Sequence, residues 1–91
     1  AGFDGLFFAC DAMALGALEE LASLGIAVPD QVGVIGFDGL GSGEFSAPPL
    51  TTVQPDFAQA GMTLVDTALA SGEDRPERRV KVHLVERASV R

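Results

Sequence analysis

The chain has 91 residues, of which 47% are hydrophobic, and its mean hydropathy is +0.29. These values exclude a disordered chain, and no apolar run approaches the roughly 20 residues that a membrane-spanning helix needs. The formal net charge is −7, and residues 1–50 contain seven acidic residues but no Lys or Arg. A surface built to neutralise nucleic-acid phosphates is therefore not expected. The single cysteine, Cys10, excludes an internal disulfide and suits a reducing compartment.

The first half of the chain has the pattern strand, helix, strand. A short apolar run at 5–9 predicts a buried strand, and Asp11 is expected to cap a helix over 12–24 that ends at Gly25. Residues 31–37 predict a second buried strand. Such a unit has parallel strands and a right-handed crossover, and the continuous apolarity of both strands predicts helices on both faces of the sheet. The predicted fold class is α/β.

The second half adds an extended segment, a helix and an edge strand. Prolines surround "LTTV" at 50–53 and exclude a helix there. Asp56 is expected to cap a helix over 57–71, a polar loop follows, and residues 80–90 alternate as an edge strand does. Two helices cannot cover both faces of a buried sheet. We therefore expect the chain to be a piece of a larger α/β protein, or to complete its core by oligomerising.

The stretch "VIGFDGLGSGE" at 34–44 takes one carboxylate, Asp38, out of a buried strand and into a glycine-rich loop. Pro48 and Pro49 prevent a helix from starting promptly, and no lysine ends the motif, so a phosphate-binding loop is not expected. Asp38 could either cap backbone amides of the turn or accept hydrogen bonds from the hydroxyls of a neutral ligand.

Other chemistry finds little support. His83, the only histidine, is interpreted as a solvated surface residue, and Cys10 as a buried filler rather than a nucleophile. No metal-ligand spacing, cofactor motif or acid–base pair is present in the sequence, so neither a cofactor nor enzymatic activity is predicted.

The order of motifs closely resembles the C-terminal part of LacI/GalR-family bacterial transcriptional regulators. The motifs are "ACDAMALGA", "GIAVPDQVGVIGFDG", "PPLTTV" and "LVERAS", and they span nearly the whole chain. The resemblance implies a fragment of a two-lobe, flavodoxin-like effector-binding domain related to periplasmic binding proteins. It implies that residues 1–50 belong to the C-terminal lobe, and that residues 51–91 form the last crossing segment, a helix and a final strand that return to the N-terminal lobe.

The resemblance also implies a site and a dimer. Asp38 and Cys10, with Asp11, match the positions that contact the effector in that family, although the family usually has asparagine at the position of Cys10. The first helix and the loop after Asp38 match a dimer interface, for which we single out four residues: Leu15, Ala22, Phe45 and Ser46. Packing against other parts of the same chain is the alternative for these side chains.

The sequence therefore favours an effector-sensing and dimerisation domain of a cytoplasmic repressor. The effector is expected to be a carbohydrate or related polar metabolite, and DNA to bind only through a helix-turn-helix domain that this chain lacks. No membrane partner is predicted. The alternative is a periplasmic-type sugar- or solute-binding protein of a transport system, although residues 1–11 lack the pattern of a signal peptide.

Overall fold

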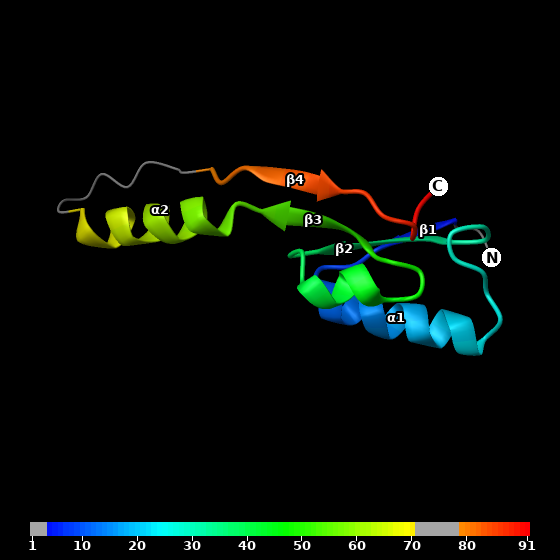
Figure 1. The fold of residues 1–91 in the computed structure, drawn as a ribbon. Helices are drawn as coiled ribbons and strands as arrows, with labels where there is room; N and C mark the ends of the chain where they lie inside the picture. The colour runs from blue at the N-terminus through cyan, green and yellow to red at the C-terminus, as the bar shows by residue number, and fades with distance from the viewer. Residues whose placement is uncertain (1–3, 71–78) are drawn as a thin grey trace.

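The computed structural model describes residues 4–70 and 79–91. Strand β1 (Gly5–Phe7) leads into helix α1 (Asp11–Ser23), which is followed by β2 (Gly33–Phe37) and by the short 3₁₀ helix η1 (Gly41–Phe45). Strand β3 (Thr51–Pro55), helix α2 (Phe57–Leu69) and β4 (Val82–Val85) complete the chain (Figure 1). The predicted polar loop after α2 lies mostly outside the described residues.

One mixed sheet with the order β1-β2-β3-β4 holds the four strands together. The β1–β2 and β2–β3 pairs are parallel, whereas β4 runs antiparallel to β3 at the edge. The predicted α/β class and the parallel strand–helix–strand unit are therefore confirmed. Both α1 and η1 lie below the sheet in Figure 1, and Phe7 is 64% exposed. The predicted coverage of both faces is thus not met by the described residues.

Of the two predicted ends of α1, the C-terminal end at Gly25 is confirmed and the N-terminal cap is not. At its C-terminus Gly25 has φ +74°, its N–H donates to Ala22 O, and Ile26 N–H donates to Leu21 O. This is the Schellman arrangement that a glycine after the last turn favours. At the N-terminus the prediction is wrong, because Cys10 is the cap residue and Asp11 is already helical.

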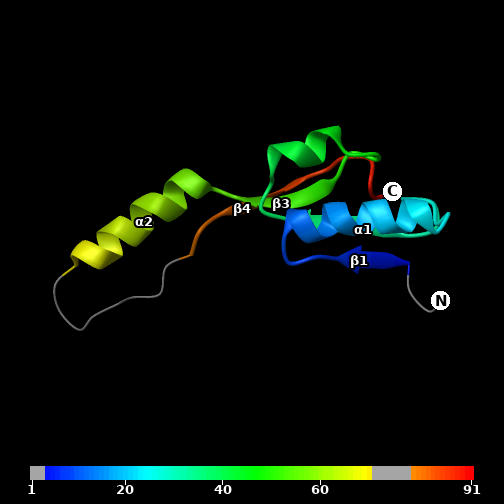
Figure 2. The ribbon, with the colours of Figure 1, turned by 90° about the horizontal axis from the view of Figure 1, so that it is seen from below.

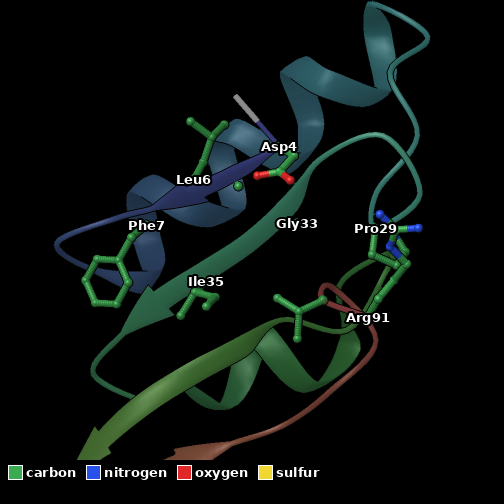
Figure 3. Close-up of a pocket in the computed structure, with 9 residues that line it drawn as sticks. Asp4, Leu6, Phe7, Pro29, Gly33, Ile35 and Arg91 are labelled. Atoms are coloured by element: carbon green, nitrogen blue, oxygen red, sulfur yellow. The ribbon is translucent and has the colours of Figure 1, made fainter. Parts of the chain in front are cut away.

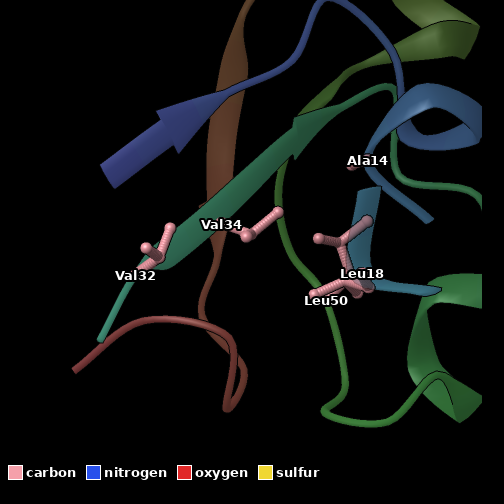
Figure 4. Close-up of a cluster of buried hydrophobic side chains, with 5 residues drawn as sticks. All are labelled: Ala14, Leu18, Val32, Val34 and Leu50. Carbon is pink, nitrogen blue, oxygen red and sulfur yellow. The ribbon is translucent and has the colours of Figure 1, made fainter. Parts of the chain in front are cut away.

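The apolar core is small and lies between α1 and the sheet (Figure 4). It is formed by five buried side chains, Ala14, Leu18, Val32, Val34 and Leu50. Helix α2 has no buried residue and extends away from the sheet (Figures 1 and 2). The radius of gyration is 16.8 Å, whereas a compact chain of this length has about 12 Å. A second layer over α2 is therefore absent among the described residues.

The end of the chain returns to the first half. Ser89 N–H donates to Pro49 O, Val34 N–H donates to Ser89 O, and the buried Ser89 hydroxyl donates to Val34 O. Arg87 donates from its guanidinium to Leu50 O at 2.9 Å. Thr51 at the start of β3 also bonds to Arg87 and Ser89, so residues 87–89 are held by β2, by the loop before β3 and by β3 itself. The division into lobes at residue 50 remains a prediction.

Candidate functional site

The carboxyl ends of the parallel strands form the rim on which the predicted site residues lie. Phe7 and Ile35 are register partners in the parallel pair β1–β2, and the chain reaches Cys10 three residues after the first and Asp38 three residues after the second. Ligands of open parallel sheets bind outside this edge. The structure therefore brings the segments of Cys10 and Asp38 to one end of the sheet, as the sequence predicts.

Asp38 has an unusual backbone. Its φ is +113°, and it is the only non-glycine residue with positive φ in the described part of the chain; Gly39 follows with φ +80°. The Asp38 N–H donates to Val53 O at 2.9 Å, which ties the turn to β3. A residue with a Cβ is held at such a φ only when its surroundings over-determine it, and such residues gather at functional sites.

The Asp38 side chain is half-buried, and its carboxylate accepts no hydrogen bond from the described residues. The alternative that Asp38 caps amides of the glycine-rich turn finds no support, because the amide of that turn at Leu40 donates to Asp11 instead. The carboxylate of Asp38 is left available at the rim.

Asp11 behaves differently from the other two predicted contacts. It is 0% exposed, its Oδ2 accepts from Leu40 N at 2.6 Å, and its Oδ1 accepts from the Thr52 hydroxyl at 2.6 Å. Both oxygens are engaged within the protein. This geometry disfavours the predicted contact between Asp11 and an effector, because no part of the side chain reaches the surface.

Gln54 is a rim residue that the sequence reasoning missed. Its side chain lies against Gly39, where an added Cβ would come within 2.7 to 2.9 Å of Gln54 Cβ, Cγ and Cδ. It lines a hollow with Lys81 and His83, and its amide makes no hydrogen bond to described residues. The only signal in the sequence was a polar residue next to Pro55, which does not distinguish a site from an exposed edge.

A second hollow lies along the open face of β1 and β2 (Figure 3). Asp4, Gly33, Pro29 and Arg91 line it, together with Phe7 and Ile35, which stand side by side on neighbouring strands. It runs along the whole of β1, and none of the predicted effector-contact residues lines it. In the described residues, no group of three or more His, Cys, Asp or Glu side chains could hold a metal ion.

The predicted dimer residues are not equally free. Phe45 is 84% exposed, and Ala22 is exposed. Leu15 instead packs against the core cluster, and the Ser46 hydroxyl donates to Gly43 O at 2.9 Å and Pro48 O at 2.8 Å. Phe45 and Ala22 thus remain candidates for an interface, whereas Leu15 and Ser46 have partners in their own chain.

Comparison with known proteins supports the same architecture. A family model described as a periplasmic binding protein-like domain matches residues 3–90. The chain belongs to this family. It is 43% identical over 60 residues to the HTH-type transcriptional repressor PurR of Glaesserella parasuis, an alignment that covers 66% of the chain and 18% of that repressor. The chain thus spans about a fifth of that relative's length.

Solved structures agree with the family assignment. A LacI-type transcription regulator from Bifidobacterium animalis subsp. lactis superposes with a TM-score of 0.84 at 36% identity, over 97% of this chain and 33% of that one. A LacI family regulator from Enterococcus faecalis V583 with bound ribose gives a TM-score of 0.81 at 31% identity, over 99% of this chain and 35% of that one. The predicted resemblance to part of the effector-binding domain of LacI-type regulators is confirmed. No helix among the described residues of this periplasmic binding protein-like chain is long and apolar enough to cross a membrane.

Proposed function

We propose that the chain is the effector-sensing part of a cytoplasmic LacI-type transcriptional regulator, which is not an enzyme, and that it holds a small polar ligand against Asp38. The observation that carries the proposal is the strained, half-buried Asp38 at the carboxyl edge of the sheet, whose carboxylate has no partner among the described residues. A charged acceptor of this kind suits hydroxyl or ring N–H donors. Its hydrogen bonds are worth about 1.5–3 kcal/mol each when formed in a desolvated site.

A carbohydrate or related polar metabolite is the ligand class we propose. The similar regulator from Enterococcus faecalis V583 was solved with ribose, a molecule rich in hydroxyl groups. At the rim, Gln54 supplies an amide, a group that both donates and accepts hydrogen bonds. Cys10 cannot, because a thiol is a weak donor and acceptor. In this proposal Gln54 forms some of the hydrogen bonds to the ligand that an asparagine at position 10 would form.

Isothermal titration calorimetry of the intact protein tests the site. We would titrate D-ribose and lactose, which present hydroxyl donors. For a probe that binds, Asp38→Ala is expected to weaken affinity by about 10- to 150-fold, the equivalent of one charge-assisted hydrogen bond. Asp30→Ala is the matched control, because Asp30 is an exposed acid in a turn away from the rim, and it should leave affinity within about two-fold.

Two outcomes contradict the proposal. One is an unchanged affinity in Asp38→Ala, which would remove Asp38 from the site. The other is an absence of binding to either sugar, which would contradict a sugar-binding site at this rim. Asp38→Asn refines the result, because it retains an acceptor oxygen but loses the charge, and it is expected to lie between the parent and Asp38→Ala.

We further propose that the protein acts as a homodimer, with Phe45 and Ala22 at the interface. An aromatic side chain that is 84% exposed favours burial against another surface. Phe45→Glu is expected to shift sedimentation velocity from dimer to monomer, whereas Ala27→Glu, which adds the same charge to an exposed loop residue, is not. A dimer that survives Phe45→Glu would contradict this interface. In the proposal, DNA is bound only through a helix-turn-helix domain outside this chain.

The alternative function, a solute-binding protein of a transport system, has the same fold. The matching family model describes a periplasmic binding protein-like domain, a fold that does not separate the two functions. Cell fractionation distinguishes them, since the proposed regulator is cytoplasmic and co-purifies with DNA. Recovery of the protein from the periplasm would overturn the proposal that it is a regulator.

A further inference from the structure

Asp11 is a buried carboxylate for which the proposed ligand contacts have no use. It lies at the first residue of α1 and is fully buried, and the helix N-terminus favours its negative charge. Gly36 on β2 makes room for it, because a Cβ there would overlap Asp11 Oδ1. The sequence thus leaves a space near the carboxyl end of β2 for this one side chain.

The two hydrogen bonds of Asp11 reach two other parts of the chain. Oδ2 accepts from Leu40 N, 29 residues away, and Oδ1 accepts from the Thr52 hydroxyl, 41 residues away on β3. Asp11 therefore joins the start of α1 to the turn that follows β2 and to the strand next to it. Side-chain acceptors of this kind fix the direction as well as the distance of the groups they bind.

The turn that carries Asp38 is fastened at both of its ends. Its first N–H, that of Asp38 itself, donates to Val53 O at 2.9 Å, and the N–H of Leu40 donates to Asp11 at 2.6 Å. Between these two bonds lie the two consecutive residues with positive φ, Asp38 and Gly39. Without the second bond the strained φ of Asp38 has one fixed end only, and the turn can relax.

We propose that Asp11 is a positioning residue for Asp38, and that it does not contact the effector itself. The inference rests on the proposed function, in which Asp38 binds the ligand. Asp11 holds Leu40 N–H and so keeps the Asp38 carboxylate aimed at the rim. Thr52 has a different role, because its hydroxyl donates to the other oxygen of Asp11 and makes no hydrogen bond to the turn.

Three substitutions distinguish the role of Asp11 from that of Thr52. Asp11→Ala leaves Leu40 N–H with no acceptor. Asp11→Asn keeps both bonds, because its amide oxygen accepts from Leu40 N–H while its NH₂ group donates to the Thr52 oxygen. Thr52→Val keeps the shape of the side chain and the Leu40 bond, but removes the hydroxyl, so it perturbs the buried cluster without releasing the turn.

Hydrogen–deuterium exchange of the intact protein tests the positioning without a ligand. In Asp11→Ala, exchange of the segment 38–45 is expected to rise at least ten-fold relative to α2, while Asp11→Asn and Thr52→Val stay within about three-fold of the parent. Equal exchange of that segment in Asp11→Ala and Thr52→Val would overturn the inference, because Asp11 would then be only one member of a buried cluster. Protection of 38–45 in Asp11→Ala would overturn it as well.

Titration with D-ribose gives the second arm. We expect Asp11→Ala to weaken affinity at least ten-fold, Asp11→Asn to restore it to within about three-fold, and Asp11→Ala to have no further effect in an Asp38→Ala background. A direct ligand contact by the carboxylate would instead make Asp11→Asn as weak as Asp11→Ala. If Asp38→Ala alone leaves affinity unchanged, the proposed function fails, while the exchange experiment still decides the role of Asp11.

Discussion

Replacement of Asp38 by glycine is expected to stabilise the protein while it removes ligand binding. Asp38 has φ +113°, in the left-handed half of backbone space where a Cβ is unfavourable. Residues held in such regions cost on the order of 1–3 kcal/mol each. Glycine adopts positive φ at no steric cost, so Asp38→Gly releases this strain in the folded state.

The expected gain is smaller than the strain itself. Glycine also gives the unfolded chain more freedom, which costs about 0.5–1 kcal/mol relative to a residue with a Cβ. The carboxylate of Asp38 makes no hydrogen bond to described residues, so its removal breaks no hydrogen bond among them. The net increase in the free energy of unfolding is therefore about 0–2.5 kcal/mol, since about 0.5–1 kcal/mol is subtracted from about 1–3 kcal/mol of released strain.

Urea unfolding followed by circular dichroism measures this increase, with Asp38→Ala as the matched control. Alanine keeps a Cβ at the same φ, so Asp38→Ala is expected to be no more stable than the parent, although both variants lose affinity for the ligand. A midpoint for Asp38→Gly that does not exceed that of Asp38→Ala would refute the reasoning. The positive φ of Asp38 would then not lower the free energy of unfolding.

Three further outcomes follow from the contacts. Gly36→Ala is expected to destabilise the protein by about 1–3 kcal/mol in urea unfolding, because its Cβ would overlap Asp11. Gly16→Ala in α1 has open space around the added Cβ and should stabilise the protein by about 1 kcal/mol. Equal effects of the two substitutions would contradict the close packing of Gly36 against Asp11. Ser89→Ala should cost about 1–3 kcal/mol by the same measurement, since it leaves a buried backbone N–H of β3 without its acceptor, and a neutral result would mean that the end of the chain is not held there. Cys10→Asn is expected to tighten D-ribose binding in calorimetry by several-fold, as an amide donates and accepts where a thiol does so weakly; weaker binding would place position 10 outside the site.

Elements that depend on local patterns could be predicted from the sequence. The three predicted strands at 5–9, 31–37 and 80–90 contain β1, β2 and β4, and the predicted extended segment at 50–53 became part of β3. Helix α1 differs from its predicted range by one residue at each end. Asp56 caps α2 as predicted, with its carboxylate accepting from Gln59 N at 2.9 Å. Each of these signals lies within about four residues of the structure it specifies, which is why it can be read without the fold.

What depends on distant contacts could not be predicted. Asp11 followed by an apolar helix is the same pattern whether its carboxylate caps that helix or crosses to Leu40 and Thr52. The short helix η1 also escaped prediction, because a 3₁₀ turn needs few residues and fits between Leu40 and the prolines that follow. The orientation of Asp38 was likewise open, since the φ of a residue before glycine depends on the groups that hold the turn.

The buried residues include both apolar and polar side chains, and this mixture explains how so small a unit can position the rim accurately. Among the described residues, five hydrophobic side chains are buried, and four polar ones, Asp11, Thr51, Thr52 and Ser89, are buried with them. Apolar burial has no direction, so five such residues bring α1 and the sheet together without fixing a turn to a fraction of an ångström. Hydrogen bonds do have direction, and every buried side-chain polar atom among the described residues has a partner. A site that needs one carboxylate held at an unfavourable φ therefore depends more on the four polar residues than on the five apolar ones.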